Sequence, residues 1–192
     1  MNHLAHIYLA GENTNLVIGN YIADYLRGNK FDHLPEEIIQ GVYMHRKIDT
    51  FTDEHPKFRA ATKLIRPTIG KYAGVAVDIY FDYFLAQHWN KFHVSNLPDF
   101  ANSVYSLIEQ EWVHIPEKGR RFYSYMVAHN LLYKYGELKT IDMVFNGIHS
   151  MTKFESNLNQ AGIVLASNKE ELEGIFFDFF QDLRQYINHL ND

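Results

Sequence analysis

The sequence predicts an all-α protein folded as a single-domain helical bundle. Through most of its 192 residues the apolar side chains recur at intervals of three and four, as in α-helices, and the two-residue alternation of strands is scarce. With 46% hydrophobic and 15% aromatic residues, the chain can bury a substantial core. It contains no repeat, low-complexity run or Pro/Gly/Ser-rich linker, so we expect one domain over residues 1–192.

The expected helices follow one another between prolines and glycines. The first covers about residues 13–26, and Gly28 beyond it suits a left-handed helix end. The second opens at Pro35, because proline fits a first helical turn, and it must end before Pro56. The third covers about residues 72–92. Further helices are expected at about 98–114, 118–135 and 137–150, and the last begins near Asn168.

The second helix carries polar residues on the face that should be buried. Positions 38, 42, 45 and 49 advance by four, three and four, so Ile38, Val42, His45 and Asp49 share one face. An unpaired charge on a buried face costs on the order of several kcal/mol, so His45 and Asp49 need compensation. A bound cation would supply it, and a structural hydrogen bond between the two residues is the alternative.

The third helix repeats this pattern with Asp78 and Asp82, whose carboxylates repel each other at a spacing of four unless they share a cation. His6 and Asp24 add further donors from the N-terminal segment and the first helix. Because the chain has no cysteine, any metal must be held by nitrogen and oxygen. Such donors favour Mn²⁺, Mg²⁺ or Fe²⁺. The candidate ligands are His6, Asp24, His45, Asp49, Asp78 and Asp82.

Charge and segment composition exclude several classes of function. The formal net charge of −5 argues against a general nucleic-acid-binding protein, which needs a basic surface. No stretch approaches the roughly 20 apolar residues that cross a bilayer, and the N-terminus does not resemble a secretory signal. We therefore expect a soluble cytoplasmic protein with no membrane partner. The Walker, Gly-x-Ser-x-Gly and His-Glu-x-x-His motifs are missing from the sequence.

Four motifs in the first half of the chain keep a specific order and spacing. They are residues 2–6 (NHLAH), 19–24 (GNYIAD) with Arg27 and Gly28, 41–49 (GVYMHRKID) with Thr52 and Asp53, and 77–85 (VDIYFDYFL) with His88 and Trp89. Together they resemble the acyl carrier protein phosphodiesterase family, whose length the chain also matches. The second half resembles this family mainly in its helical character and in Asn146-Gly147.

The resemblance implies a hydrolase that cleaves the phosphodiester between 4′-phosphopantetheine and a serine of holo acyl carrier protein through metal-activated water. It also implies a helical fold like that of a divergent branch of the HD phosphohydrolases, with Mn²⁺ as the favoured cation and Fe²⁺ or Mg²⁺ as alternatives. This chain has no His-Asp dipeptide, so the usual HD order cannot assign its ligands. The expected metal ligands are His6, Asp24, His45, Asp49 and Asp78. The expected catalytic residues are Asp24, Asp82 and His88.

Acyl carrier proteins are small and acidic, so an enzyme acting on one should carry a basic docking surface near its site. Basic residues outnumber acidic ones between positions 27 and 71, although an ordinary mixture of solvated charges is the alternative. The candidate docking residues are Arg27, Arg46, Lys47, Lys57 and Arg59. Two other functions remain open: an HD-like phosphohydrolase of a nucleotide or small phosphoester, and a non-catalytic helical binding module. The sequence predicts no particular oligomeric state.

Overall fold

A computed structural model describes residues 1–28, 31–152 and 156–191 of the chain, and all regular elements in these ranges are helical, which confirms the all-α prediction. The α-helices are α1 (His3–Leu9), α2 (Thr14–Ile22), α3 (Glu36–Glu54), α4 (Pro56–Ile69), α5 (Ala73–Gln87), α6 (Leu97–Gln110), α7 (Glu117–Ala128), α8 (Leu131–Lys134), α9 (Leu138–Met151), α10 (Ala161–Ser167) and α11 (Lys169–Asn191). Short 3₁₀ helices are η1 (Ala23–Tyr25), η2 (Gly70–Tyr72), η3 (Trp89–Lys91), η4 (Trp112–His114) and η5 (Leu158–Gln160).

The expected helices are present, with differences at their ends. Gly28 has the predicted positive φ of 60°, but it lies beyond the end of η1 rather than directly at a helix end. The helix expected over 118–135 is broken between α7 and α8, because Asn130 adopts a left-handed conformation with φ of 51°. Three helices were not predicted: α1, α4 and α10. The first is too short to show a period, and α4 contains Pro67, which argues against a helix in sequence reasoning.

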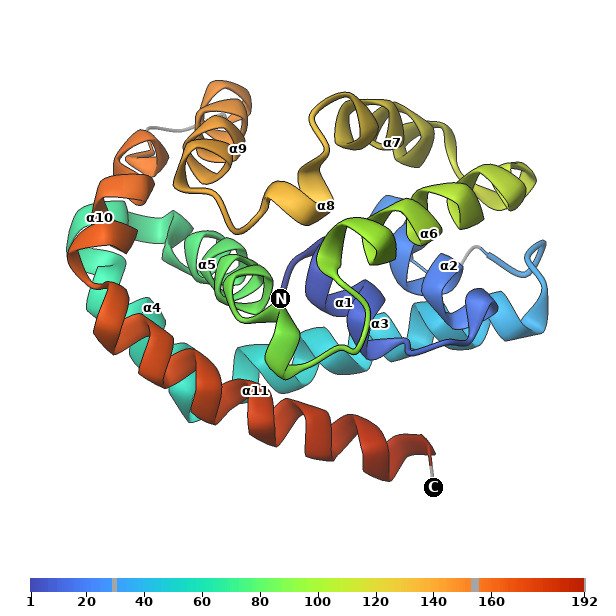
Figure 1. Ribbon diagram of the computed structural model, residues 1–192, viewed down its shortest axis with the longest axis horizontal. Helices are drawn as coiled ribbons and strands as arrows, with labels where there is room; N and C mark the ends of the chain where they lie inside the picture. The colour runs from blue at the N-terminus through green and yellow to red at the C-terminus, as the bar shows by residue number, and fades with distance from the viewer. Residues whose placement is uncertain (29–30, 153–155, 192) are drawn as a thin grey trace.

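The first helix, α1, lies in the interior. In α1 five residues are buried, and the helix contacts α2 and α5, while α3 runs along α2 (Figure 1). The long helix α11 lies side by side with α4 along another edge of the molecule (Figure 1). Buried apolar side chains from both halves of the chain join in one core cluster. In the described part of the chain, no helix has the length and apolar character needed to cross a membrane.

Helices α2 and α3 touch backbone to backbone at two glycines. A Cβ on Gly41 would lie 2.6 Å from the carbonyl oxygen of Leu16 and 2.8 Å from the Cα of Gly19. A Cβ on Gly19 would in turn overlap the carbonyl oxygen of Ile38. All three contacts are shorter than those that real Cβ atoms show, so only glycine fits at either position. This contact sets how closely η1, at the end of α2, approaches α3.

Candidate metal centre

Four of the predicted ligands meet in the structure. His6 Nε2 lies 3.1 Å from Asp49 Oδ1, and His45 Nε2 lies 3.2 Å from both Asp24 Oδ1 and Asp49 Oδ2. They come from three elements: His6 from α1, Asp24 from η1, and His45 and Asp49 from successive turns of α3. Both histidines are buried, whereas about half of each aspartate side chain is exposed. Two imidazoles at the base and two carboxylates at the surface therefore converge on one point.

A neighbouring asparagine orients the more deeply placed histidine. Asn20 is buried and donates through Nδ2 to the Leu16 carbonyl oxygen at 3.1 Å, which directs its Oδ1 towards His6 Nδ1 at 3.4 Å. The proton of a neutral His6 is therefore favoured on Nδ1, and the lone pair on Nε2 faces Asp49. The His6 and His45 rings stack with centroids 3.8 Å apart and planes 17° apart, so their Nε2 atoms face the same carboxylate.

The charges of the two histidines differ sharply. Burial and the nearby His45 lower the pKa of His6 to about 4, so it is neutral at pH 7. Burial also disfavours a charged His45, but hydrogen bonds to Asp24 and Asp49 outweigh this and raise its pKa to about 9. The same contacts overcome the desolvation of Asp24 and lower its pKa to about 2, and they lower the pKa of Asp49 as well. A proton on His45 thus holds the two carboxylates together when no cation is bound.

These residues fit a divalent cation. His6 Nε2 is buried and makes no hydrogen bond of acceptable geometry, although Asp49 is within 3.1 Å. A buried nitrogen without a hydrogen-bond partner is costly, and a cation would pair with its lone pair. Ligand atoms of His6, His45 and Asp49 all lie within 4.8 Å of one another. Mixed imidazole and carboxylate donors suit Mn²⁺ or Fe²⁺, and a carboxylate-rich set suits Mg²⁺.

The cluster opens into a pocket of about 350 Å³. Asp78 lines this pocket and binds the N-terminal ammonium of Met1 through Oδ1 at 2.6 Å. Burial raises the pKa of Asp78, and the ammonium opposes that rise. The pocket also contains Asp53, which the sequence argument noted only as part of a motif. The lining residues are Met1, Asn2, Asp24, His45, Asp49, Thr52, Asp53, Val75, Asp78, Ile79 and Ile148.

The structure does not bring Asp82 and His88 into the pocket lining. Asp82 is fully buried and accepts backbone N–H groups of Asn2, Leu4 and Ala5 at 3.2, 2.7 and 3.3 Å. Burial raises its pKa to about 7, against the opposing effect of the ammonium and these donors, so Asp82 serves the N-terminus of α1. His88 lies at the end of α5, where Nε2 is 2.7 Å from Glu173 Oε1 of α11. We therefore assign neither residue to the chemical step.

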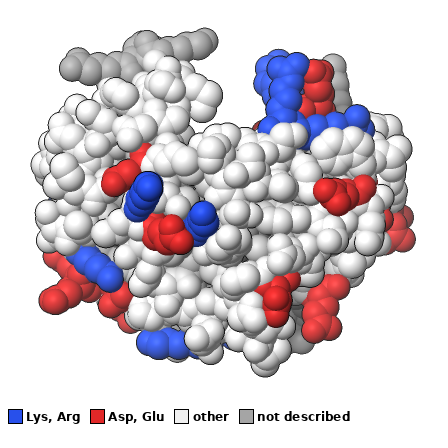
Figure 2. Space-filling model, turned by 45° about the horizontal axis from the view of Figure 1, so that its top comes forward, with Lys and Arg blue, Asp and Glu red and all other residues white. Residues whose placement is uncertain are grey.

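The predicted docking residues are partly engaged elsewhere. Arg27 and Lys47 are exposed, and Arg46 donates to the Gly28 carbonyl oxygen. Lys57 binds Asp178 of α11 at 2.5 Å, and Arg59 donates through Nε to the carbonyl oxygen of Asp53 at 3.1 Å. On the face shown in Figure 2, basic and acidic side chains are interspersed and most of the surface is uncharged. That face carries no continuous basic patch.

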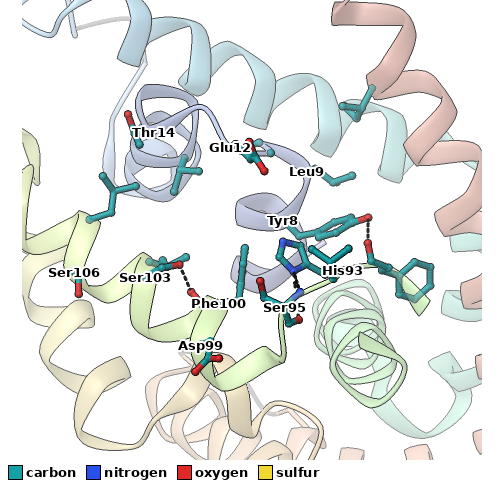
Figure 3. A pocket seen from close by; sticks show the side chains of 18 of the residues that line it. Tyr8, Leu9, Glu12, Thr14, His93, Ser95, Asp99, Phe100, Ser103 and Ser106 are labelled. Atoms are coloured by element: carbon teal, nitrogen blue, oxygen red, sulfur yellow. Dashed lines mark hydrogen bonds between the residues drawn. The ribbon is translucent and has the colours of Figure 1, made fainter. Parts of the chain in front are cut away.

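A second, larger hollow of about 960 Å³ lies between α1, α6 and α11 and shares no lining residue with the first. Three of its polar side chains bond to backbone atoms. Tyr8 donates to the Phe92 carbonyl oxygen, Ser103 donates to that of Phe100, and His93 Nδ1 accepts from the backbone N–H of Ser95 (Figure 3). In the described part of the chain, the group of three or more potential metal donors lies at His6, His45 and Asp49, not here.

Several residues of the smaller pocket were outside the reach of sequence reasoning. Ile148 reaches it from α9, about a hundred positions beyond His45 of α3, and no local pattern links the two. Asn20 was visible, since it precedes Asp24 by one helical turn, but its hydrogen bond to His6 requires the packing of α1 on α2. Val75 could have been suspected as a pocket residue, because it lies one turn before Asp78 on the same face of α5.

Comparison with known proteins follows from these observations. The sequence model of a family described as acyl carrier protein phosphodiesterase matches residues 1–183. An acyl carrier protein phosphodiesterase of Klebsiella pneumoniae (strain 342) is 34% identical over 188 residues, covering 95% of each chain. Its namesake from Yersinia pestis is 30% identical over 191 residues, covering 98% of each chain. No solved structure matches, so the likeness to HD phosphohydrolases stays a prediction.

Proposed function

The chain belongs to the acyl carrier protein phosphodiesterase family, and from that premise we propose that it hydrolyses the phosphodiester joining 4′-phosphopantetheine to a serine of holo acyl carrier protein. The products are apo carrier protein and free 4′-phosphopantetheine. The observation that carries the proposal is the convergence of His6, His45, Asp24 and Asp49 beside a pocket of about 350 Å³. The cytoplasmic location expected from the sequence remains part of this proposal.

The pocket itself argues for a cation. It contains four aspartates, which are Asp24, Asp49, Asp53 and Asp78, and a phosphodiester is an anion. The Met1 ammonium is paired with Asp78 and the proton of His45 is shared by Asp24 and Asp49, so the four carboxylates outnumber these positive charges and would repel an anionic substrate unless a cation were bound. We propose that His6, His45, Asp24 and Asp49 hold Mn²⁺, with Fe²⁺ or Mg²⁺ as alternatives. A cation there supplies charge beside the phosphoryl oxygens and makes a nearby water more acidic.

The protein's own groups then bind and move protons. In the overall reaction the oxygen of water joins phosphorus, the bond from phosphorus to the serine oxygen breaks, and that oxygen gains a proton. Asp78 is the residue we assign to proton transfer, because it lines the pocket and burial raises its pKa above that of an ordinary aspartate. Asn20 keeps His6 Nε2 directed at the cluster, and Asp82 fixes the start of α1, which carries His6.

We propose that exposed basic side chains near the pocket receive the acidic carrier protein. Arg27 follows η1, which carries Asp24, and Lys47 is exposed on the same turns of α3 as His45 and Asp49, but on another face of the helix. Arg59 contacts the backbone of Asp53, a pocket residue. Opposite charge on two surfaces speeds their encounter and sets their relative orientation. Arg46 and Lys57 belong to the same region, although Lys57 is also tied to α11.

The test is a discontinuous assay of the purified protein with holo acyl carrier protein, with and without Mn²⁺. We expect release of 4′-phosphopantetheine that requires the added cation, measured by mass spectrometry of the carrier protein. Cleavage of small phosphoesters without release from the carrier would favour a general phosphohydrolase. No cleavage of either substrate at any cation concentration would favour a binding module.

A further inference from the structure

The pocket beside the metal cluster has one apolar side. Val75 and Ile79 of α5 lie one turn apart, and Ile148 of α9 joins them in the lining. Ile79 is buried, whereas 40% of Val75 is exposed, although it belongs to a residue type that is usually buried. The remaining side chains of the lining are mostly polar or charged. Ligand pockets combine an apolar lining with a few polar groups, so these three side chains offer a surface on which an apolar part of a ligand can pack.

The chemistry of the proposed substrate is asymmetric about phosphorus in the same way. On one side the ester oxygen belongs to a serine, which continues into a polar polypeptide backbone. On the other side a single methylene group separates the ester oxygen from a carbon that carries two methyl groups. These methyl groups must lie close to the phosphate whatever shape the rest of the arm adopts. An apolar surface that recognises them must therefore border the phosphate site directly.

Resting on the proposed function, we propose that Val75, Ile79 and Ile148 bind the dimethyl-substituted carbon of 4′-phosphopantetheine and so select this phosphodiester. The carboxylates of α3 and η1 and the imidazole of His45 line the same pocket and would hold the phosphate through the cation. Selection follows because a phosphodiester that lacks a branched aliphatic group would reach the cluster without covering Val75. The volume of about 350 Å³ suits the phosphate and the first part of the arm, leaving the distal part outside.

The arrangement also determines the direction of the substrate. With the dimethyl carbon against α5 and α9, we place the serine side of phosphorus towards Asp24 of η1 and Asp53 of α3, which line the same pocket. Arg27 and Arg59, the proposed docking residues, are adjacent to those two aspartates in sequence or by contact. The apolar residues and the basic residues therefore both place the carrier protein on the side of Asp24 and Asp53.

The experiment measures binding of two probes to the Mn²⁺-loaded full-length protein by calorimetry: free 4′-phosphopantetheine and inorganic phosphate. The variant is Val75→Asn combined with Ile148→Asn. Its matched control is Val113→Asn combined with Ile163→Asn, since both residues are exposed and neither lines the pocket. Circular dichroism of both double variants checks that the helices are retained.

We expect the pocket variant to bind 4′-phosphopantetheine about tenfold more weakly, the loss that corresponds to two methyl groups left in water. Phosphate should bind it as it binds the wild type, and the control should match the wild type with both probes. An equal loss for both probes, or no loss for either, would overturn the proposal. If the pocket variant loses affinity for 4′-phosphopantetheine alone but the wild type does not cleave holo carrier protein, the proposed reaction would be refuted and the proposed binding surface would stand. If the wild type and the pocket variant cleave holo carrier protein at the same rate, the proposed role of Val75, Ile79 and Ile148 would be refuted and the proposed reaction would stand.

Discussion

The two hollows of this molecule differ in a way that separates size from chemistry. The larger one, of about 960 Å³, is nearly three times the volume of the smaller, yet its Tyr8, His93 and Ser103 side chains bond to nearby backbone atoms. In the smaller one, side chains from three elements point their ligand atoms at one another. Convergence of potential ligand atoms, rather than volume, is the reason that we propose the smaller hollow as the reactive site.

Removing a ligand should produce the largest contrast between the two hollows. Asp24→Ala and His45→Ala should each lower turnover of holo carrier protein by about a thousandfold or more, because the residues that hold a catalytic group act as a unit. His93→Ala, in the larger hollow, should change turnover less than twofold. Initial rates at saturating Mn²⁺ measure both. A comparable loss in His93→Ala would transfer the active site to the larger hollow.

The affinity for a metal ion should depend on pH through the proton of His45, in the smaller hollow. In the cation-free protein His45 has a pKa of about 9, so a cation must displace its proton at lower pH. The apparent Mn²⁺ affinity should therefore rise about tenfold per pH unit between pH 6.5 and 8.5. His6, with a pKa of about 4, is already neutral and adds no further slope. Calorimetry in buffers of different ionisation enthalpy should detect about one proton released per cation, and none would contradict this assignment.

Charge reversal tests the surface around the smaller hollow. Arg27→Glu combined with Lys47→Glu should slow association with holo carrier protein by about tenfold, with little effect on hydrolysis of a small chromogenic phosphodiester. The control is Lys118→Glu with Lys139→Glu, both exposed and on other helices. Stopped-flow association across salt concentrations measures the effect, which should shrink as ionic strength rises. If both pairs slow association equally, net charge rather than this surface governs the encounter.

The smallest expected effect is on stability. Asp24→Ala should change the free energy of unfolding of the cation-free protein at pH 7 by less than about 1 kcal/mol, since 51% of the side chain is exposed and its ion pair is screened by water. Asp49 remains to hold the proton of His45. Urea denaturation in the presence of a chelator measures it. A loss of several kcal/mol would mean that Asp24 supports the fold rather than the cation.

Local spacing was enough to predict most of the cluster. His45 and Asp49 occupy successive turns on the face of α3 that the apolar spacing predicts to be buried, so their polarity conflicted with that prediction, although Asp49 is about half exposed. Asp24 followed from the same argument and from the resemblance, and His6 from the resemblance and its place in the first motif. Asp78 and Asp82 showed an equal conflict, yet their partners are an ammonium and three backbone N–H groups of the N-terminal segment. A pattern reveals that a buried charge needs a partner, but tertiary packing decides which one.

Elements without a period were beyond prediction for a related reason. Helix α1 has seven residues, too few to display an amphipathic repeat, although it supplies His6 and occupies the interior. Helix α4 accommodates Pro67 within its last turn, where local propensity alone favours an earlier end. His88 was a catalytic candidate because it belongs to the fourth motif of the family resemblance, but it pairs with Glu173 and connects α5 to α11. Contacts between distant segments decided each of these cases.

The glycine contact between α2 and α3 bears on which ions the proposed metal site would distinguish. Asp24 continues the chain of α2, and His45 and Asp49 follow Gly41 by one and two turns, so the ligand spacing is inherited from two backbones that already touch. Side-chain repacking at that contact cannot widen the site, because no side chain is there. Mg²⁺ and Ca²⁺ differ by about 0.3–0.5 Å in their preferred distance to oxygen. A methyl group at position 19 or 41 would force the helices apart by more than that difference. The two glycines would therefore determine which ionic radius fits the proposed site.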